Sequence, residues 1–405
     1  QRGGWMSERL TTEGFQGYLV VTLSYWVFTL TDGAIRMLVV LYFHQLGYAP
    51  LEIAMLFLFY EFFGVVTNLV GGWIGSRIGL NRTMQIGIGM QVVALSLLAV
   101  PTAWLSVPYV MAAQALSGVA KDLNKMSAKA SVKLMLPKQQ ESARLFKWVS
   151  ILTGSKNALK GGGFFLGALL LAQFGFQMAL LLLAGMLLIS LVINWLLLSE
   201  EIGKTQHKPK FSQLFSRTRE INWLSAARFF LFGARDVWFV VALPLFLAST
   251  MEWNHLQVGG FLAVWIIGYG IVQSLVPLWL KRGQHLPDGK TAMKVALMLA
   301  VIPAGIAWGL VLQWDPAWVV TLGLLLFGVF FAVNSAIHSY LILAYSEHDK
   351  VATNVGFYYM ANAGGRLMGT VLSGWLYQMQ GMAACLGWSA LMVLIAGLIS
   401  IKLPR

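Results

Sequence analysis

The most regular feature of the sequence is a series of twelve long apolar segments separated by short polar stretches. Most of them reach the roughly 20 residues that a helix needs to cross the hydrocarbon core of a bilayer. The sequence therefore predicts an all-α integral membrane protein with twelve transmembrane helices, at residues 16–43, 53–72, 83–103, 106–132, 148–172, 176–199, 221–249, 256–280, 295–314, 317–345, 351–378 and 382–401. No cleavable signal peptide is expected, because the first segment is long and charged, and residues 1–5, before Met6, are left out of the interpretation.

The longest polar stretch, residues 200–220, divides the predicted helices six and six. A weak repeat supports this division, since residues 51–53 (LEI) match residues 256–258 (LQV) ahead of the second and eighth segments. Parallel six-helix repeats around a central site are typical of one large transporter class. We expect an N-terminal tail at 1–15, a six-helix bundle at 16–199, a linker at 200–220, a second bundle at 221–401 and a C-terminal tail at 402–405.

Lys and Arg residues outside the apolar segments are distributed unevenly. All twenty of them fall in the loops and tails on the side of the N-terminus, and none falls in the six opposite loops, near residues 45, 104, 174, 252, 315 and 380. Basic loops favour the cytoplasmic side, so both termini and the linker are predicted to be cytoplasmic. The net charge of +13 then reflects topology and contact with anionic lipid, and a nucleic-acid partner is not expected.

Composition agrees with a membrane protein and gives no sign of an enzyme. The chain is 58% hydrophobic and 11% charged, with a mean hydropathy of +0.70. The single cysteine, Cys385, excludes an intrachain disulfide and a cysteine metal cluster. The six His residues are scattered, and no Gly-rich nucleotide loop occurs, so neither a metal nor another cofactor is expected.

Charged residues inside the predicted helices are the strongest functional signal. A charge near the bilayer centre costs roughly 2.5–3.5 kcal/mol on insertion scales, so such residues usually face a bundle interior or a wet cavity. The bases are Arg36, Lys121, Lys125, Lys129, Lys156, Lys160, Arg228, Arg235 and Arg366, and the acids are Asp32, Glu61, Asp122 and Asp236. Even if every acid pairs with one base, five bases remain, which predicts an anionic substrate carrying several charges.

The loop between the second and third segments resembles the signature loop of the major facilitator superfamily, Gly-x-x-x-Asp-Arg-x-Gly-x-x-Arg. The matching residues, which we predict to form a gating loop, are Gly72, Ser76, Arg77, Gly79 and Arg82. Ser76 replaces the Asp of the pattern, which weakens the charge contacts of that loop. The resemblance implies the fold of this superfamily, in which segments 1, 4, 7 and 10 line a central cavity and segments 2, 5, 8 and 11 flank it.

The bases fall on segments 1, 4, 5, 7 and 11, and Asn124 and Asn157 lie beside them. The predicted substrate-binding residues are Arg36, Lys121, Lys125, Lys156, Lys160, Arg228, Arg235, Arg366, Asn124 and Asn157. The three arginines of the second half are the strongest candidates for bidentate contacts to an oxyanion. Segment 10 adds Asn334, Ser335 and His338.

Several of these residues have a structural alternative. Lys129 can extend to the headgroups, Asp32 and Arg36, four residues apart, can form an ion pair that braces helices, and Lys160 can serve packing at the glycines that follow it. Arg235 and Asp236 can likewise be a structural pair.

The acids Asp32, Glu61, Asp122 and Asp236 are predicted to act in ion pairs or in coupling. Glu61 lies in an apolar, aromatic segment, which suits a proton carrier, with Asp32 and Asp236 as competing candidates. A neutral Glu61 held by a structural hydrogen bond is the alternative.

Four charged motifs resemble the ArsJ family of organoarsenical efflux permeases within this superfamily, and the likeness extends over nearly the whole chain from about residue 17. They are YWVFTLTDGAIR at 25–36, ALSGVAKDLNKMS at 115–127, LTGSKNALK at 152–160 and LFGARDVWF at 231–239. The resemblance implies export of 1-arseno-3-phosphoglycerate through a bacterial inner membrane, and arsenate resistance. We expect this export to be proton-coupled. Glyceraldehyde-3-phosphate dehydrogenase makes this labile ester from arsenate, which gives a functional link without a required contact. An organophosphate exchanger of the same superfamily and, from another class, a membrane sensor or scaffold are the alternatives.

Overall fold

The computed structural model describes residues 2–135, 141–198, 218–282, 286–346 and 351–404, which are almost entirely α-helical. The helices of the first half are α1 (Arg2–Gln45), α2 (Pro50–Leu56), α3 (Leu58–Ile78), α4 (Leu80–Leu98), α5 (Val107–Met135), α6 (Glu141–Phe174) and α7 (Phe176–Leu197). Those of the second half are α8 (Arg219–Phe239), α9 (Ala242–Ser249), α10 (His255–Arg282), α11 (Gly289–Val311), α12 (Pro316–Ala344), α13 (Val351–Gln380) and α14 (Met382–Ser400). A short 3-10 helix, Thr102–Trp104, precedes α5.

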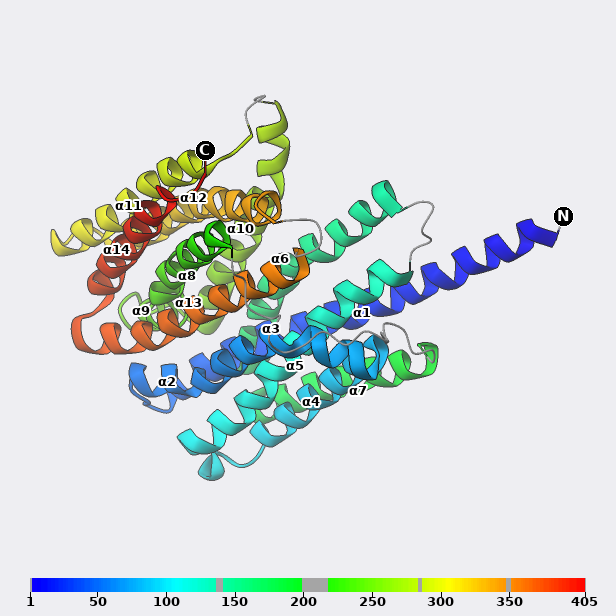
Figure 1. The fold of residues 1–405 in the computed structure, drawn as a ribbon. Coiled ribbons are helices and arrows are strands. Elements are labelled where there is room, and N and C mark those ends of the chain that lie inside the picture. The colour runs from blue at the N-terminus through cyan, green and yellow to red at the C-terminus, as the bar shows by residue number, and fades with distance from the viewer. Residues whose placement is uncertain (1, 136–140, 199–217, 283–285, 347–350, 405) are drawn as a thin grey trace.

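Each of the twelve predicted segments corresponds to one helix or to a pair of consecutive helices, and the helices form two halves (Figure 1). The second segment consists of α2 and α3, and the seventh consists of α8 and α9, so these two segments are not the continuous helices that were predicted. The break between α8 and α9 frees backbone amides inside the bundle. Ser373 Oγ on α13 accepts hydrogen bonds from the amides of Val241 and Ala242, at 3.2 and 3.0 Å, so the break leaves neither amide unpaired.

The chain ends differ from the expected tails. Helix α1 already begins at Arg2, so residues 2–15, which were predicted to form a separate tail, continue the first membrane helix. At the other end, the carbonyl oxygen of Pro404 accepts hydrogen bonds from the amide of Gly289 and the hydroxyl of Tyr345. The predicted linker at 200–220 lies mostly outside the described residues, and its boundaries stay a prediction.

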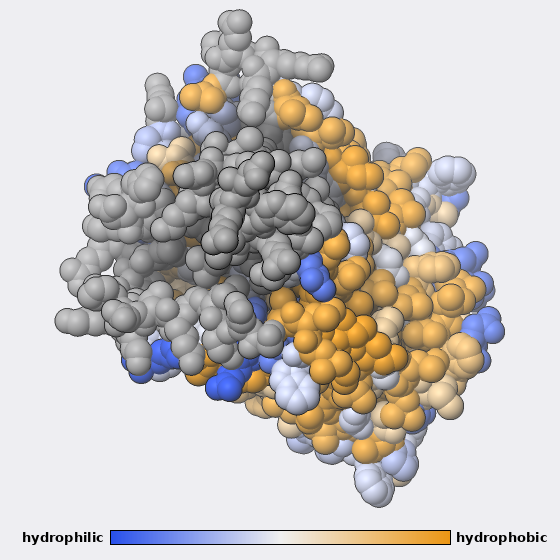
Figure 2. Space-filling model, turned by 90° about the vertical axis from the view of Figure 1, so that its right-hand side faces the viewer, coloured by the Kyte–Doolittle hydropathy of each residue, from blue (hydrophilic) through white to orange (hydrophobic). Residues whose placement is uncertain are grey.

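The outer surface of the described helices is apolar. Eight spans in the part of the chain that the structure describes are long and apolar enough to cross a membrane, from α1, α2–α3, α7, α8–α9, α10, α11, α12 and α14. Large side chains such as Trp195, Val301 and Trp318 are about two-thirds exposed, which is expected where helices face lipid. Figure 2 shows such a continuous hydrophobic surface on one face of the molecule. The four other predicted spans, on α4, α5, α6 and α13, hold many of the polar and charged residues of the interior.

The two halves pack against each other along α6 with α10 and along α13 with α2 and α3. Small residues permit these close approaches. A Cβ on Gly270 of α10 would lie 2.6 Å from the Cβ of Asn157 on α6, and one on Gly374 of α13 would meet Ala54 and the carbonyl oxygen of Pro50 on α2. The amide of Leu51 also donates to Gln378 Oε1 at 3.0 Å. The bundle is therefore closed between the halves at the end where α2 meets α13.

Candidate functional site

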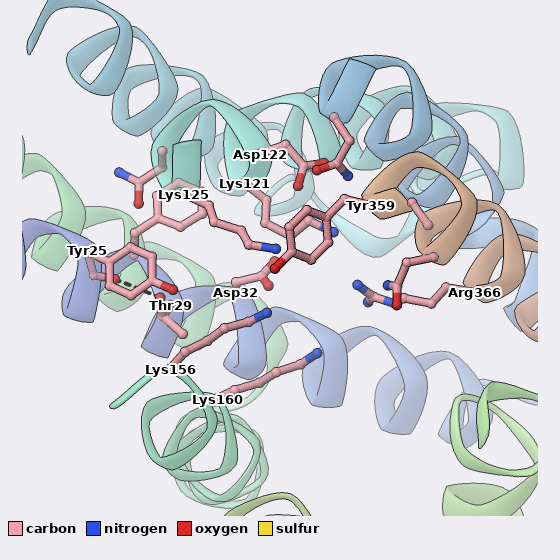
Figure 3. Close-up of a pocket in the computed structure, with 15 residues that line it drawn as sticks. Tyr25, Thr29, Asp32, Lys121, Asp122, Lys125, Lys156, Lys160, Tyr359 and Arg366 are labelled. Carbon is pink, nitrogen blue, oxygen red and sulfur yellow. Dashed lines mark hydrogen bonds between the residues drawn. The ribbon is translucent and has the colours of Figure 1, made fainter. Parts of the chain in front are cut away.

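A cavity that is partly open to solvent lies between the two halves. Its walls come from α1, α3, α5, α6 and α13 (Figure 3). The lining residues are Tyr25, Phe28, Thr29, Asp32, Asn68, Lys121, Asp122, Asn124, Lys125, Lys156, Lys160, Tyr359, Asn362, Ala363 and Arg366. Five of these side chains are basic and two are acidic, so the cavity carries an excess of positive charge.

The four cavity lysines come from two helices of the first half. Lys121 and Lys125 are one turn apart on α5, as are Lys156 and Lys160 on α6, so the spacing seen in the sequence brings each pair to one wall. Nζ of Lys121 lies 4.4 Å from the centre of the Tyr60 ring, and Nζ of Lys125 lies 5.1 Å from that of Tyr359 on α13. Figure 3 shows the side chains of Lys121 and Lys125 and those of Lys156 and Lys160 extending into the same space around Asp32.

Polar groups complete the wall formed by α5. Asn124 is fully buried, and neither its amide oxygen nor its amide nitrogen has a hydrogen-bond partner among the described residues. One carboxylate oxygen of the neighbouring Asp122 is likewise buried without such a partner. Buried polar atoms are normally hydrogen-bonded, so atoms of this kind beside a cavity are suited to a ligand or to water.

A chain of ion pairs lies at the end of the cavity. Arg36 Nη2 on α1 is 3.2 Å from Glu61 Oε1 on α3, and the same oxygen is 3.4 Å from Arg366 Nη2 on α13. Arg366 Nε is 3.5 Å from Asp236 Oδ2 on α8, whose other oxygen is 2.8 Å from Arg235 Nε. This ion-pair chain, Arg36–Glu61–Arg366–Asp236–Arg235, crosses from one half to the other through the Glu61–Arg366 contact.

The surroundings of two predicted acids differ from expectation. The apolar setting predicted for Glu61 is wrong, because its carboxylate lies between two guanidinium groups, which hold it in ion pairs. The possible Asp32–Arg36 pair within α1 is also replaced. Asp32 Oδ1 accepts a 2.8 Å hydrogen bond from the hydroxyl of Tyr60, while Arg36 turns to Glu61. The sequence could not reveal this exchange, because both partners come from α3.

Two predicted substrate-binding arginines of the second half do not line the cavity. Arg228 donates from Nε to Asn362 Oδ1 at 2.7 Å and from Nη1 to Ser335, so protein atoms accept from two of its three nitrogens. Arg235 pairs with Asp236 and lies over Phe232 at 4.9 Å from the ring centre. The structural alternative for Arg235 and Asp236 therefore agrees with the geometry.

Arg36 and Asn157 also lie off the cavity wall. Arg36 belongs to the ion-pair chain, and Asn157 packs against Gly270 of α10, on a different face of α6 from Lys156. The glycines after Lys160 do serve packing, since Gly161 meets α10 and Gly163 meets α1. Lys160 nevertheless lines the cavity.

Several lining residues were not singled out from the sequence. Asn362 and Tyr359 precede Arg366 by four and seven residues, which places them on the same face of α13, and this spacing was the available signal. Asn68 follows Glu61 by seven residues, which likewise places both on the same face of α3. On α12, Asn334 and His338 are fully buried, and they do not belong to the cavity wall.

The predicted gating loop forms the turn between α3 and α4. Gly79 has a φ of 90°, a conformation that favours glycine, and its amide bonds to the carbonyl oxygen of Gly75. Arg77 lies over the Trp73 ring at 4.1 Å, and Arg82 is exposed. Gly72 and Ser76 belong to α3, but their surroundings lie outside what the structure describes, as does the side chain of Lys129.

The observation that decides the family is a match to the profile described as the Major Facilitator Superfamily, which covers residues 21–370. The chain belongs to the major facilitator superfamily. Its helices, arranged in two halves around a cavity, have the fold of that superfamily, and it is a multi-pass membrane protein of a transporter family.

Solved transporter structures have the same fold. A POT family transporter in complex with 5-aminolevulinic acid aligns with a TM-score of 0.75 at 15% identity, covering 95% of both chains. A mutant of the peptide transporter POT in complex with sulfate aligns with a TM-score of 0.76 at 15% identity, covering 95% of this chain and 94% of the other. No curated protein matches the chain. At such low identity these similarities establish the fold and leave the substrate to the residues of the cavity.

Proposed function

We propose that this protein exports a small organic anion with several charges, 1-arseno-3-phosphoglycerate, from the cytoplasm of a bacterium and thereby confers resistance to arsenate. The observation that supports this proposal best is the basic cavity, in which four lysines and Arg366 face only two aspartates. The arsenic itself enters from the resemblance of the charged helix motifs to organoarsenical efflux permeases.

The charge of the site fits a substrate with two anionic ends. The cavity and the ion-pair chain together contain seven bases and four acids, a formal excess of three positive charges. Buried charges need compensation, because an isolated charge in a medium of low polarity is costly. An ester with one arsenate and one phosphate group supplies three to four negative charges, more than inorganic arsenate or phosphate supplies alone.

Transport would proceed by alternating access, in which the two halves rock around the site. On α1 the lining residues Tyr25, Thr29 and Asp32 precede Arg36, so the cavity lies between the ion-pair chain and the end of the bundle where α1 begins. The positive-inside pattern assigns this end to the cytoplasm. In this arrangement the anion enters from the cytoplasm while the contacts of α13 with α2 close the opposite side.

Proton coupling is part of the proposal, and the geometry separates the four acids. Glu61 and Asp236 are held by arginines, and Asp32 accepts from Tyr60. Asp122 lines the cavity with one oxygen that lacks a hydrogen-bond partner among the described residues. We therefore favour Asp122 over Glu61 as the proton carrier. Loss of coupled transport in Glu61→Gln together with normal coupling in Asp122→Asn would contradict this choice.

Everted membrane vesicles, whose cytoplasmic face points outward, test the function. Arsenate, glyceraldehyde 3-phosphate, NAD and the dehydrogenase are supplied outside, and arsenic inside the vesicles is measured. Accumulation that requires both the dehydrogenase and this protein supports export of the ester. Accumulation from arsenate alone would contradict it. If phosphorylated three-carbon acids are instead exchanged without any effect of arsenate, the protein is an organophosphate exchanger.

A further inference from the structure

Asn362 on α13 connects the cavity to a buried polar contact in the second half. Its side-chain oxygen accepts a 2.7 Å hydrogen bond from Arg228 Nε, and the same residue lines the cavity. Arg228 also donates from Nη1 to the carbonyl oxygen and the hydroxyl of Ser335 on α12, at 3.2 and 2.9 Å. Arg228 thus joins α8, α12 and α13 directly behind the cavity wall.

The chemistry of these groups fixes the orientation of the Asn362 amide. A guanidinium group can only donate, so the atom of Asn362 that faces Arg228 must be the carbonyl oxygen, and the amide NH2 group must point away. Among the described residues, this NH2 group has no protein partner, and it does not belong to the buried atoms without a partner. It is therefore accessible from the cavity that Asn362 lines.

Arg228 is held firmly enough to set this orientation. It is 5% exposed, and its guanidinium lies 4.0 Å from the centre of the Phe232 ring and 5.1 Å from that of Tyr358. The N–H donors of a planar guanidinium group have fixed relative directions. Aromatic rings packed against the plane of the group, together with acceptors for its Nε and Nη1, therefore hold Arg228 in one orientation. Arg228 does not line the cavity, so it is not placed to contact a substrate directly.

We propose, on the basis of the function proposed above, that Arg228 is a positioning residue and that Asn362 donates a hydrogen bond to an uncharged oxygen of the substrate. Asn362 and Arg366 are one helical turn apart on α13, about 6 Å along the axis. If the anionic group of the substrate is held at Arg366, an atom further along the carbon chain of the substrate therefore lies near Asn362. A carbonyl or hydroxyl oxygen of a short carbon chain meets this requirement, and an inorganic oxyanion has no such atom.

The assignment makes the second half responsible for recognising the organic part of the anion. The lysines of α5 and α6 attract any oxyanion, because an ammonium group acts as a point charge with little directional preference. A neutral amide with a fixed donor distinguishes ligands by whether they offer an acceptor at its position. Asn362 is thus a specificity-determining residue that the charge pattern of the sequence does not reveal.

Binding to the purified, detergent-solubilised protein tests the proposal. One probe is a hydrolysis-resistant phosphonate analogue of the ester, in which a methylene replaces the acyl ester oxygen while the carbonyl and hydroxyl oxygens remain. The other is inorganic phosphate. Asn362→Leu should weaken binding of the analogue about three- to tenfold, the range for one neutral hydrogen bond, and should change phosphate binding less than about twofold.

Arg228 variants distinguish positioning from direct contact or simple charge. Arg228→Met should reproduce the selective loss of Asn362→Leu, and the double variant should be no weaker than Asn362→Leu alone. Arg228→Lys, which keeps the charge but not the fork, should also lose affinity for the analogue. Additive losses, a normal Arg228→Lys, or equal losses for both probes would overturn the proposal.

Two controls keep these outcomes interpretable. If Arg228→Met does not fold, Asn362→Leu decides alone, because it leaves the contacts of Arg228 with Ser335 in place. If the wild-type protein binds phosphate but not the analogue, the organic-anion function itself fails. If the wild type binds the analogue and the Asn362 variant binds it equally well, only the role of Asn362 and Arg228 fails.

Discussion

Replacement of Glu61 by Gln tests whether the ion-pair chain holds the two halves together. The Glu61 side chain is 1% exposed and contacts Arg36 at 3.2 Å and Arg366 at 3.4 Å. Gln keeps the shape of the side chain but removes the charge, so the buried Arg36 and the partly buried Arg366 lose their shared counter-charge. Arg366 keeps its contact with Asp236 at 3.5 Å, and Arg36 keeps its contacts with the rings of Phe57 and Tyr60. These remaining contacts reduce the expected loss of stability.

Removing one partner of a buried pair costs about 3–5 kcal/mol, and the remaining contacts place the expected loss near the lower end, about 3 kcal/mol. The free energy of unfolding is measured by denaturant titration in mixed micelles. Glu252→Gln, which changes an exposed acid, is the control and should stay within about 0.5 kcal/mol of the wild type.

The double variant Glu61→Gln with Arg366→Gln shows whether the loss comes from this contact. It should cost less than the sum of the single variants, with a coupling of about 0.5–3 kcal/mol. A Glu61→Gln protein as stable as the control, or strictly additive costs, would refute the role given to the ion-pair chain.

Three further predictions concern packing, charge and topology. Gly365→Ala places a methyl group against the backbone of Phe229 on α8 and should destabilise the protein by about 1–3 kcal/mol. Gly387→Ala, whose methyl group would meet nothing within 4 Å, is the control and should leave the stability unchanged. Equal unfolding midpoints for the two variants would contradict the close contact between α13 and α8. Lys160→Gln should weaken binding of the phosphonate analogue about tenfold or more, because hydrogen bonds to charged groups contribute about 1.5–3 kcal/mol, and an unchanged affinity would exclude Lys160 from the site. In a Cys385→Ala background, Glu252→Cys should react with an impermeant maleimide on intact cells, and Leu286→Cys should react only after lysis. The reverse pattern would show that the predicted orientation in the membrane is wrong.

The helices and the basic site could be predicted from the sequence because both depend on local spacing. Apolar runs of membrane length identify helices, and lysines one turn apart on α5 and α6 must share a face. Those lysine pairs do meet in one cavity. The breaks that separate α2 from α3 and α8 from α9 gave no such signal, since the second depends on Ser373 of a distant helix.

The partners of the charges could not be predicted for a related reason. Periodicity tells which face of its own helix a residue occupies, but the contacts of Glu61 with Arg36 and Arg366 join three helices. Likewise, Arg228 appeared to be a ligand because an unpaired base within a membrane needs a counter-charge. In the structure, neutral acceptors on Asn362 and Ser335 instead accept hydrogen bonds from its Nε and Nη1.

The central claim, that the lysine-lined cavity carries an organic anion out of the cell, is tested most directly by arsenic accumulation in everted vesicles of two variants. Lys160→Gln removes a cavity base, and Lys290→Gln removes an exposed base outside the cavity. With arsenate, glyceraldehyde 3-phosphate, NAD and the dehydrogenase supplied, the account predicts wild-type accumulation for Lys290→Gln. For Lys160→Gln it predicts that the initial rate at subsaturating ester falls at least about tenfold below that of the wild type. This reduction corresponds to a loss of about 1.5 kcal/mol or more of binding free energy. Equal rates for the two variants, or accumulation that does not require the dehydrogenase, would contradict the account.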